Sequence, residues 1–257
     1  MSVCISIQAV EKTYVTARRE KVYALAPVSL EVAAGEFVSV VGPSGCGKST
    51  LLKILGGLLS RSSGRAEIMG TPIEGPRGDV GIVFQDPVLL GWRTVLQNTL
   101  LPAEILRLDR RAALERARGL IKLVGLEGFE DKYPMELSGG MRQRNSIIRA
   151  LIHDPAVLLM DEPFGALDAM TREQMNLELQ RIWLESRKTV FFITHSIPEA
   201  VFLADRVVVM SARPGRIREI IAVDLPRPRS MSTMGDSRFV EHNQHIRRLL
   251  FSEGSLD

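Results

Sequence analysis

The sequence predicts an α/β protein in which a run of helices interrupts a core of short strands and helices. Three observations support this fold class. Apolar runs of strand length recur in both the first and the last part of the chain. The residues between them, from about 94 to 152, have helical periodicity and no convincing strand. A glycine-rich loop at 42–50 joins a buried apolar strand to an apolar helix.

The elements before the helical run are mostly strands. Residues 3–7 and 28–32 alternate between apolar and polar side chains, and the charged turn "ARREK" separates the two segments. "FVSVV" at 37–41 follows the turn "AAGE" and is apolar on both faces, which is typical of a buried strand. The pattern then predicts a helix at about 48–59 and strands near 66–69 and 79–84.

Strands and helices alternate again after the helical run. "AVLLM", "TVFFIT" and "RVVVM" predict strands at 156–160, 189–194 and 206–210, and helical stretches lie at 169–186 and 197–204. We therefore expect one domain over 1–225, with a helical subdomain at about 89–153 inserted in the α/β core. The Pro-, Arg- and Ser-rich end, 226–257, is expected to be a short tail with one helix near 238–251.

The composition restricts the class of protein. A net charge of +3 over 257 residues is too small to indicate nucleic-acid binding, and it suits a solvated face or a protein near an anionic membrane. Cys4 and Cys46 have no metal-ligand spacing, which favours a reducing compartment. The N-terminus lacks a signal-peptide pattern, and no apolar run approaches the roughly 18 residues of a membrane helix. We expect a soluble, cytoplasmic protein that binds no nucleic acid.

The loop "GPSGCGKST" fits the pattern G-x-x-x-x-G-K-[ST] between a buried strand and a helix. Its glycines let backbone N–H groups surround a polyphosphate, and the helix N-terminus adds a partial positive charge. Lys48 would reach the β and γ phosphates, and the Ser49 hydroxyl would bind Mg²⁺. A chance glycine-rich turn is the alternative, but strand, loop and helix all match. The predicted nucleotide-binding residues are Gly42, Pro43, Ser44, Gly45, Cys46, Gly47, Lys48, Ser49 and Thr50.

"LLMDEP" places two carboxylates at the carboxyl end of a strand, where α/β sheets bind ligands. Strand side chains alternate, so the two point in different directions. Asp161 would hold Mg²⁺, and Glu162 would act as general base toward the attacking water. The alternative is a pair of acidic residues that merely solvates the strand end.

"ELSGGMRQR" puts two glycines at the start of a basic, helix-forming run. Glycine costs roughly 1 kcal/mol against alanine inside a helix. The pair Gly139 and Gly140, preceded by Ser138, therefore predicts that another group comes very close to this backbone.

The order of these motifs resembles the ATP-binding-cassette (ABC) ATPases. "GPSGCGKST", "VFQDP", "LSGGMRQR", "LLMDEPFGALD" and "ITHS" follow one another over about residues 1–225. The resemblance implies a P-loop NTPase (RecA-like) core with an antiparallel β subdomain and a helical insert. It also implies binding and hydrolysis of ATP with Mg²⁺.

Further roles are implied by the resemblance alone. Tyr14 is similar to the aromatic residue that stacks on adenine, although a half-exposed tyrosine at a strand end is an alternative. Gln85 is similar to the glutamine that senses Mg²⁺ and water, or is a polar strand terminus. Asp168 is similar to an aspartate that crosses between subunits, or caps the next helix. His195 is similar to the histidine that contacts the γ phosphate, or is structural. The implied catalytic residues are Glu162, His195 and Gln85, and the implied metal ligands are Ser49, Gln85 and Asp161.

The resemblance also implies a homodimer. In this family the Ser-Gly-Gly segment docks on the γ phosphate of an ATP that the partner subunit holds, so two ATP molecules lie at the interface. Met141 stands where this family usually has glutamine, and methionine cannot make the hydrogen bonds of that amide, whereas Ser138 and the glycines are intact.

Three function classes are consistent with an ABC ATPase: the ATPase of an importer with separate permease chains, a separate-chain exporter ATPase, and a soluble non-transport ATPase. "DPVLLGWRTVLQNTLLPAEI" resembles the nitrate, sulfonate and taurine importer ATPases, whose usual pattern is L-L-P-W-R-T-V-x-x-N, with Gly91 in place of proline. In that group this region grips a short permease helix, so Trp92 is either a partner contact or part of the helical core. The importer class implies transmembrane permease subunits, an extracytoplasmic solute-binding protein as an indirect partner, and a peripheral position on the inner face of the cell membrane.

Overall fold

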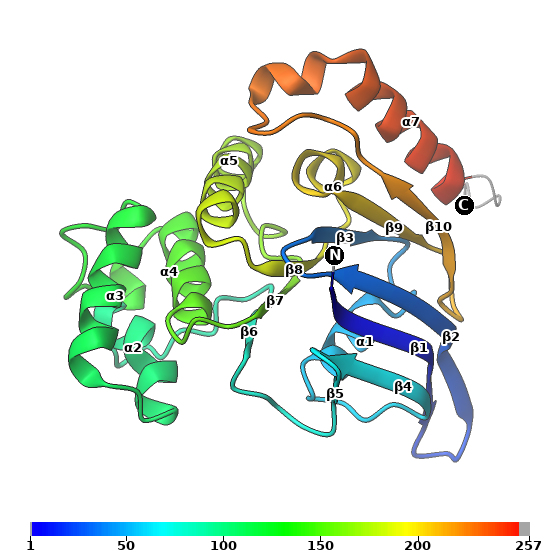
Figure 1. Ribbon diagram of the computed structural model, residues 1–257, viewed down its shortest axis with the longest axis horizontal. Coiled ribbons are helices and arrows are strands. Elements are labelled where there is room, and N and C mark those ends of the chain that lie inside the picture. The colour runs from blue at the N-terminus through cyan, green and yellow to red at the C-terminus, as the bar shows by residue number, and fades with distance from the viewer. Residues whose placement is uncertain (1, 252–257) are drawn as a thin grey trace. The chain divides into compact units, whose positions relative to one another are not determined.

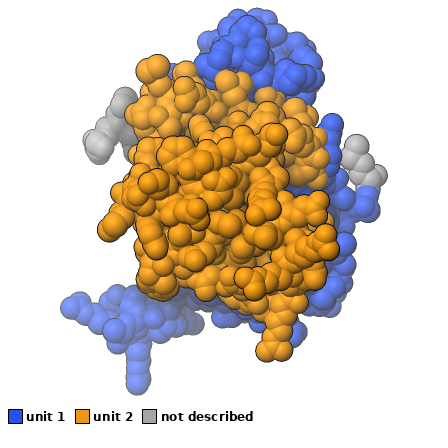
Figure 2. All heavy atoms as spheres, turned by 90° about the vertical axis from the view of Figure 1, so that its left-hand side faces the viewer, with its two compact units in different colours: residues 1–77, 187–257 blue, residues 78–186 orange. Residues whose placement is uncertain are grey.

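The computed structural model describes residues 2–251. The chain divides into two compact units: unit 1 comprises Met1–Arg77 and Arg187–Asp257, and unit 2 comprises Gly78–Ser186 (Figure 2). No helix among the described residues is both long enough and apolar enough to cross a lipid bilayer. Each unit is described below on its own.

The strands of unit 1 pair in two groups (Figure 1). The first group is antiparallel and has the order β2-β1-β4-β5. In the second group β3 pairs in parallel with both β8 and β9, and β10 is antiparallel to β9. The elements of unit 1 are β1 (Val3–Val15), β2 (Lys21–Ala33), β3 (Phe37–Val41), α1 (Lys48–Leu55), β4 (Ser63–Ile68), β5 (Thr71–Pro72), β8 (Thr189–Ile193), α6 (Ile197–Leu203), β9 (Arg206–Met210), β10 (Ile217–Ala222), the 3₁₀ helix η2 (Met231–Gly235) and α7 (Ser237–Phe251).

The central strand of this second group leads directly into the glycine-rich loop. All five residues of β3 are buried, as expected for a strand with parallel neighbours on both sides. Residues 42–47 then connect β3 to α1, which buries Leu51, Leu52, Ile54 and Leu55. The loop therefore lies at the carboxyl end of a parallel strand, the usual ligand-binding edge of an α/β fold.

Residues 226–251 of the predicted tail are more ordered than their composition suggests, and residues 252–257 lie outside the described residues. Helix α7 covers almost the residues predicted for it, and it packs on α6 and β9 (Figure 1). Arg229 is 2% exposed and donates from Nη1 to the carbonyls of Val201, Phe202 and Ala204 at 2.8–2.9 Å. Burial lowers the pKa of Arg229 to about 10. This buried arginine fixes the proline-rich segment to the end of α6.

Unit 2 contains the helical run and two parallel strands, β6 and β7. Ala103, Ala113, Ala117 and Ile152 form a buried cluster where its helices meet. The helical segment expected at about 89–153 falls within this unit. The elements are β6 (Val80–Val83), α2 (Val95–Ile105), α3 (Arg110–Leu123), the 3₁₀ helix η1 (Pro134–Glu136), α4 (Gly139–Leu151), β7 (Val157–Asp161) and α5 (Ala169–Ser186).

Most predicted elements are confirmed, and α5 has the predicted bounds. Helix α1 ends at Leu55, earlier than expected, because Gly56 and Gly57 follow. Strands β5 and β10 were not predicted.

Candidate active site

The glycine-rich loop of unit 1 folds around the amino group of Lys48. That side chain is 6% exposed, and its Nζ donates to the carbonyls of Gly42 and Pro43 at 2.7 and 3.1 Å. Ser44 and Gly45 are exposed at the loop's tip. Cys46 is fully buried, and burial raises the pKa of its thiol, so it remains protonated near neutral pH. The loop thus holds a cation at the start of a helix, as a polyphosphate requires.

Gly47 is a position in this loop where any other residue would be strained. Its φ is 98°, a left-handed conformation that favours glycine. A Cβ added there would lie 2.5 Å from Leu25 Cδ2 and 2.9 Å from the Ala24 carbonyl oxygen. The loop backbone is therefore pressed against β2.

Tyr14 lies beside the first turn of α1. Its hydroxyl is 3.3 Å from Thr50 Oγ1, and 39% of the residue is exposed. The amino group of Lys12 lies 5.2 Å from the centre of the Tyr14 ring and donates to the Ser60 carbonyl. The structure thus brings an exposed aromatic ring to the glycine-rich loop, as the predicted adenine contact requires. The position of Lys12 beside this ring was not predicted, although Lys12 and Tyr14 are two residues apart on β1 and such residues share a face of a strand.

His195 follows β8 and is exposed. The next residue, Ser196, begins α6 by accepting the Glu199 N–H at 3.4 Å, so this turn has the predicted helix start. A second cation near the loop was not predicted: Arg213 Nε donates to the Gly45 carbonyl at 3.3 Å.

The two carboxylates in unit 2 lie at the end of β7. Asp161 is its last residue, and Glu162 follows it directly. Glu162 has φ 45°, a conformation that residues other than glycine, asparagine and aspartate seldom adopt. Its carbonyl accepts the Gly165 N–H at 3.1 Å, which closes a turn. Backbone strain of this kind costs on the order of 1–3 kcal/mol and is concentrated at functional sites.

The oxygen ligands predicted for Mg²⁺ suit that ion. A serine hydroxyl, an amide oxygen and a carboxylate are hard donors, which Mg²⁺ prefers. Ser49 is half-buried in α1, Gln85 is exposed just after β6, and Asp161 is half-buried at the end of β7. Taken one by one, these side chains have the chemistry and accessibility of magnesium ligands.

Ser138 begins helix α4 and is exposed. Its Oγ accepts the Met141 N–H at 3.2 Å, so it caps the helix. Gly140 is buried, and a Cβ there would lie 3.1 Å from Thr171 Cγ2, so part of the reason for this glycine is packing within unit 2.

Asp168 lies in the same neighbourhood. Its carboxylate accepts the Thr171 N–H at 3.0 Å and the Thr171 hydroxyl at 2.7 Å. These bonds hold the pKa of Asp168 below its ordinary value. Asp168 therefore does cap the start of α5, and it remains exposed at this turn. Thr171, which bonds to Asp168 and occupies the space that a Cβ at Gly140 would need, was not predicted.

The segment after Gln85 exposes a tryptophan, Trp92, to solvent. Trp92 is 75% exposed, which excludes the alternative of core packing. The fully buried Asn98 fixes the loop beneath it: Oδ1 accepts the Leu90 N–H at 2.8 Å, and Nδ2 donates to the Arg93 and Thr94 carbonyls at 2.8 and 3.1 Å. The asparagine in the pattern V-x-x-N thus shapes the loop.

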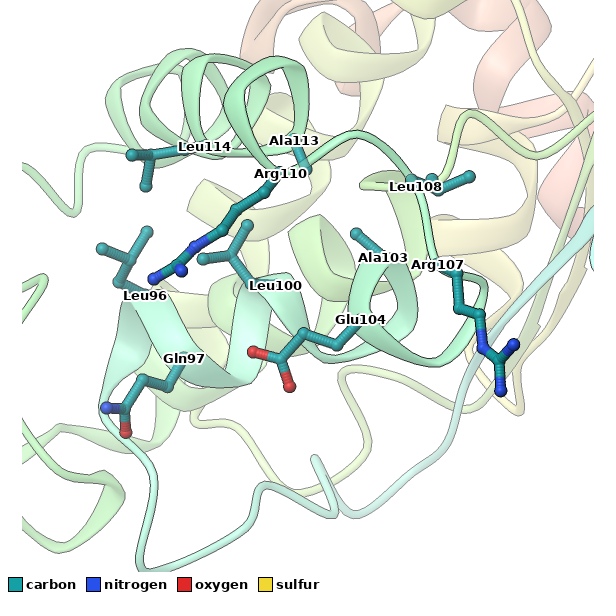
Figure 3. Close-up of a pocket in the computed structure, with 10 residues that line it drawn as sticks. All are labelled: Leu96, Gln97, Leu100, Ala103, Glu104, Arg107, Leu108, Arg110, Ala113 and Leu114. Carbon is teal, nitrogen blue, oxygen red and sulfur yellow. The ribbon is translucent and has the colours of Figure 1, made fainter.

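A groove of about 620 Å³ lies between α3 and α2, the helix that follows this loop. Leu96, Leu100, Ala103 and Leu114 supply its apolar surface, and Figure 3 shows the Arg110 side chain reaching over Leu96 and Leu100. Glu104 at its edge is paired with Arg93 at 2.6 Å. Within the described part of the chain Arg110 has no ion pair, so the groove combines apolar surface with an available cation.

Comparison with known proteins agrees with this geometry. Residues 25–165 match the family model described as ABC transporter. The chain is 47% identical over 242 residues to the taurine import ATP-binding protein TauB of Rhizobium johnstonii, covering 91% of this chain and 92% of that one. It is 48% identical over 213 residues to the aliphatic sulfonates import ATP-binding protein SsuB of Bacillus licheniformis, covering 83% and 82%.

A solved structure adds the fold. A dimeric ATP-binding cassette in a post-hydrolysis state, bound to ADP and phosphate, is similar with a TM-score of 0.75 and 33% identity. The match covers 86% of this chain and all of that one. The chain belongs to the ABC transporter family, as an ATP-binding cassette that hydrolyses ATP.

Proposed function

We propose that this protein is the ATP-hydrolysing subunit of an importer for a small sulfonate-like solute, such as taurine or an alkanesulfonate. The names of the relatives at 47% and 48% identity support this solute class. The solute itself passes through separate permease chains, and an extracytoplasmic binding protein delivers it. In this proposal the protein lies on the cytoplasmic face of the membrane and acts as a homodimer with two ATP molecules at its interface.

In this account each predicted residue has one task at the nucleotide. Lys48 leaves its two loop carbonyls to bind the β and γ phosphates, and Tyr14 stacks on the adenine. Ser49, Gln85 and Asp161 would each supply an oxygen ligand to Mg²⁺, which would neutralise charge on the phosphate oxygens. His195 contacts the γ phosphate.

Glu162 accepts the proton of the attacking water. A carboxylate in this role must be held at a fixed position, and the left-handed backbone of Glu162 supports this assignment. The exposed end of α4, with Ser138 and Gly139, docks on the γ phosphate of the ATP held by the partner subunit.

The observation that carries the importer assignment is the outward-facing Trp92 on a loop fixed by Asn98. A tryptophan that is 75% exposed on a rigid loop suits a protein contact. We assign the permease contact to this loop and to the groove between α2 and α3. The cation of Arg110 favours a permease helix that presents an acidic residue beside apolar ones.

Co-expression with a permease and binding protein of the sulfonate class tests the proposal. The wild type should co-purify with the permease, and solute uptake should require ATP. Lys48→Ala should abolish ATP turnover while the protein remains folded. Trp92→Ala should weaken permease association and retain ATP binding, whereas Tyr23→Ala, which alters another exposed aromatic residue at 58% exposure, should change neither. Normal permease association of Trp92→Ala would contradict the assigned contact.

A further inference from the structure

Arg149 connects the last turn of α4 to the segment that follows Gln85. Its two terminal nitrogens donate to successive carbonyls, Nη1 to Val88 at 2.8 Å and Nη2 to Pro87 at 2.7 Å. Burial lowers the pKa of Arg149 below its ordinary value, which still leaves the side chain charged at neutral pH. A half-buried guanidinium with two carbonyl acceptors is a fixed structural contact and not a solvated surface charge.

The backbone that Arg149 contacts is strained. Val88 has φ 47°, and a β-branched residue in this region is a clear outlier. Such a conformation costs on the order of 1–3 kcal/mol and persists only where the surroundings hold it. Arg149 binds the carbonyl of Val88 itself, so it is well placed to hold this conformation.

The other end of the same segment is held from α2. Asn98 fixes residues 90–94, and α2 is joined to α4 by the buried Asn145, whose Nδ2 donates to Thr99 Oγ1 at 2.7 Å. Residues 87–94, which we call the contact segment, are thus attached to α4 through Arg149 and to α2 through Asn98. Helix α4 has 13 residues and is therefore about 20 Å long, with Ser138 at its far end.

We propose that Arg149 is a positioning residue that couples the contact segment to the Ser138 end of α4. The inference rests on the proposed function: a permease bound at Trp92 and an ATP bound at Ser138 would each bias the same rigid unit. When ATP closes the dimer on Ser138, α4 and Arg149 constrain the contact segment. When the permease moves the contact segment, Arg149 passes that movement to α4.

Hydrogen exchange of the full chain tests the coupling without a permease. In a Glu162→Gln background, ATP should slow amide exchange in the contact segment, residues 87–94, by at least about fivefold, the lower end of coupling between linked sites. Adding Arg149→Gln should abolish this response while ATP still produces the dimer on size exclusion. Arg118→Gln, which removes an exposed arginine of α3, should leave the response unchanged.

The conservative variant guards against a folding defect. Arg149→Lys retains the charge and donates to fewer carbonyls in a fixed geometry, so it should fold and show a reduced response. A full ATP response in a dimer carrying Arg149→Gln would overturn the proposal, and so would the absence of any response with Arg149 intact.

The assembled transporter provides the second readout. Arg149→Gln should co-purify with the permease but lose the stimulation of ATP turnover by permease and solute. Equal stimulation of variant and wild type would contradict the coupling. If the wild type fails to bind any permease, the proposed function is wrong, and the exchange measurement still decides the role of Arg149.

Discussion

Replacing Asn98 with alanine tests how the contact segment is held. The side chain is fully buried and makes four hydrogen bonds to the backbone of residues 90–94. After truncation the Leu90 carbonyl still accepts the Arg93 N–H, and the Thr94 carbonyl still accepts the Asn98 N–H. The Leu90 N–H and the Arg93 carbonyl lose the partner that Asn98 provides.

The size of the effect follows from those two groups. A buried polar group left without its partner costs about 1–3 kcal/mol. Because Leu90 and Arg93 are half-buried, water can partly replace the lost bonds, so the lower half of the range applies. At about 1–2 kcal/mol for each of the two groups, we expect Asn98→Ala to lower the free energy of unfolding by about 2–4 kcal/mol.

Urea denaturation followed by circular dichroism measures this loss, and co-purification measures permease association. Asn145→Ala is the matched control, because it removes another buried amide of the helical region, bonded to Thr99 and to the Val95 carbonyl. Asn98→Ala should weaken permease association, and Asn145→Ala should not. If the two variants lose stability similarly and bind the permease equally well, the loop fixed by Asn98 is not the contact.

Three further changes address the nucleotide and the chain's last segment. Gly47→Ala would place a Cβ 2.5 Å from Leu25 Cδ2. The affinity for a fluorescent ATP analogue should therefore fall about tenfold or more, which is roughly 1.4 kcal/mol. An unchanged affinity would refute the tight packing of the loop. Asp168→Asn keeps a capping side chain and should change the free energy of unfolding by less than about 0.5 kcal/mol, whereas Asp168→Ala should lower it by about 1 kcal/mol. Equal melting temperatures of these two variants would exclude the capping role. Arg229→Met removes the donor that three carbonyls at the end of α6 share. Calorimetry should show that the free energy of unfolding falls by about 3 kcal/mol and that the melting temperature falls by roughly 6–12 °C. A fall in melting temperature below about 2 °C would contradict the structural role of Arg229.

Local patterns in the sequence were sufficient for most elements and for the glycine-rich loop. Helix α4 begins at Gly139, at the start of the basic run that indicates a helix, and β3 is buried throughout as its apolar run indicates. These two features depend on residues that are adjacent in the sequence, so they can be predicted from one sequence alone. Strand β10 was missed because Arg218 and Glu219 interrupt its apolar pattern, and its pairing with β9 is what defines it.

Contacts between distant residues could not be predicted in this way. A proline- and arginine-rich segment normally indicates solvated chain, yet Arg229 is buried because carbonyls at the end of α6 accept its hydrogen bonds. The reach of Arg149 to Pro87 spans 62 residues. Trp92 had two interpretations, and its exposure excludes core packing, while the permease contact stays a proposal.

The central claim is that Ser138 of one subunit binds the ATP held by another. Glu162→Gln preserves the shape of the side chain but cannot accept the water's proton, so turnover should fall by about 10²–10⁴-fold while ATP stays bound. Size exclusion at several protein concentrations should show this variant as a monomer with ADP and as a dimer with ATP. Adding Ser138→Arg should prevent the dimer and leave ATP binding to the monomer nearly intact. A dimer that forms equally well with arginine at position 138 would contradict the account.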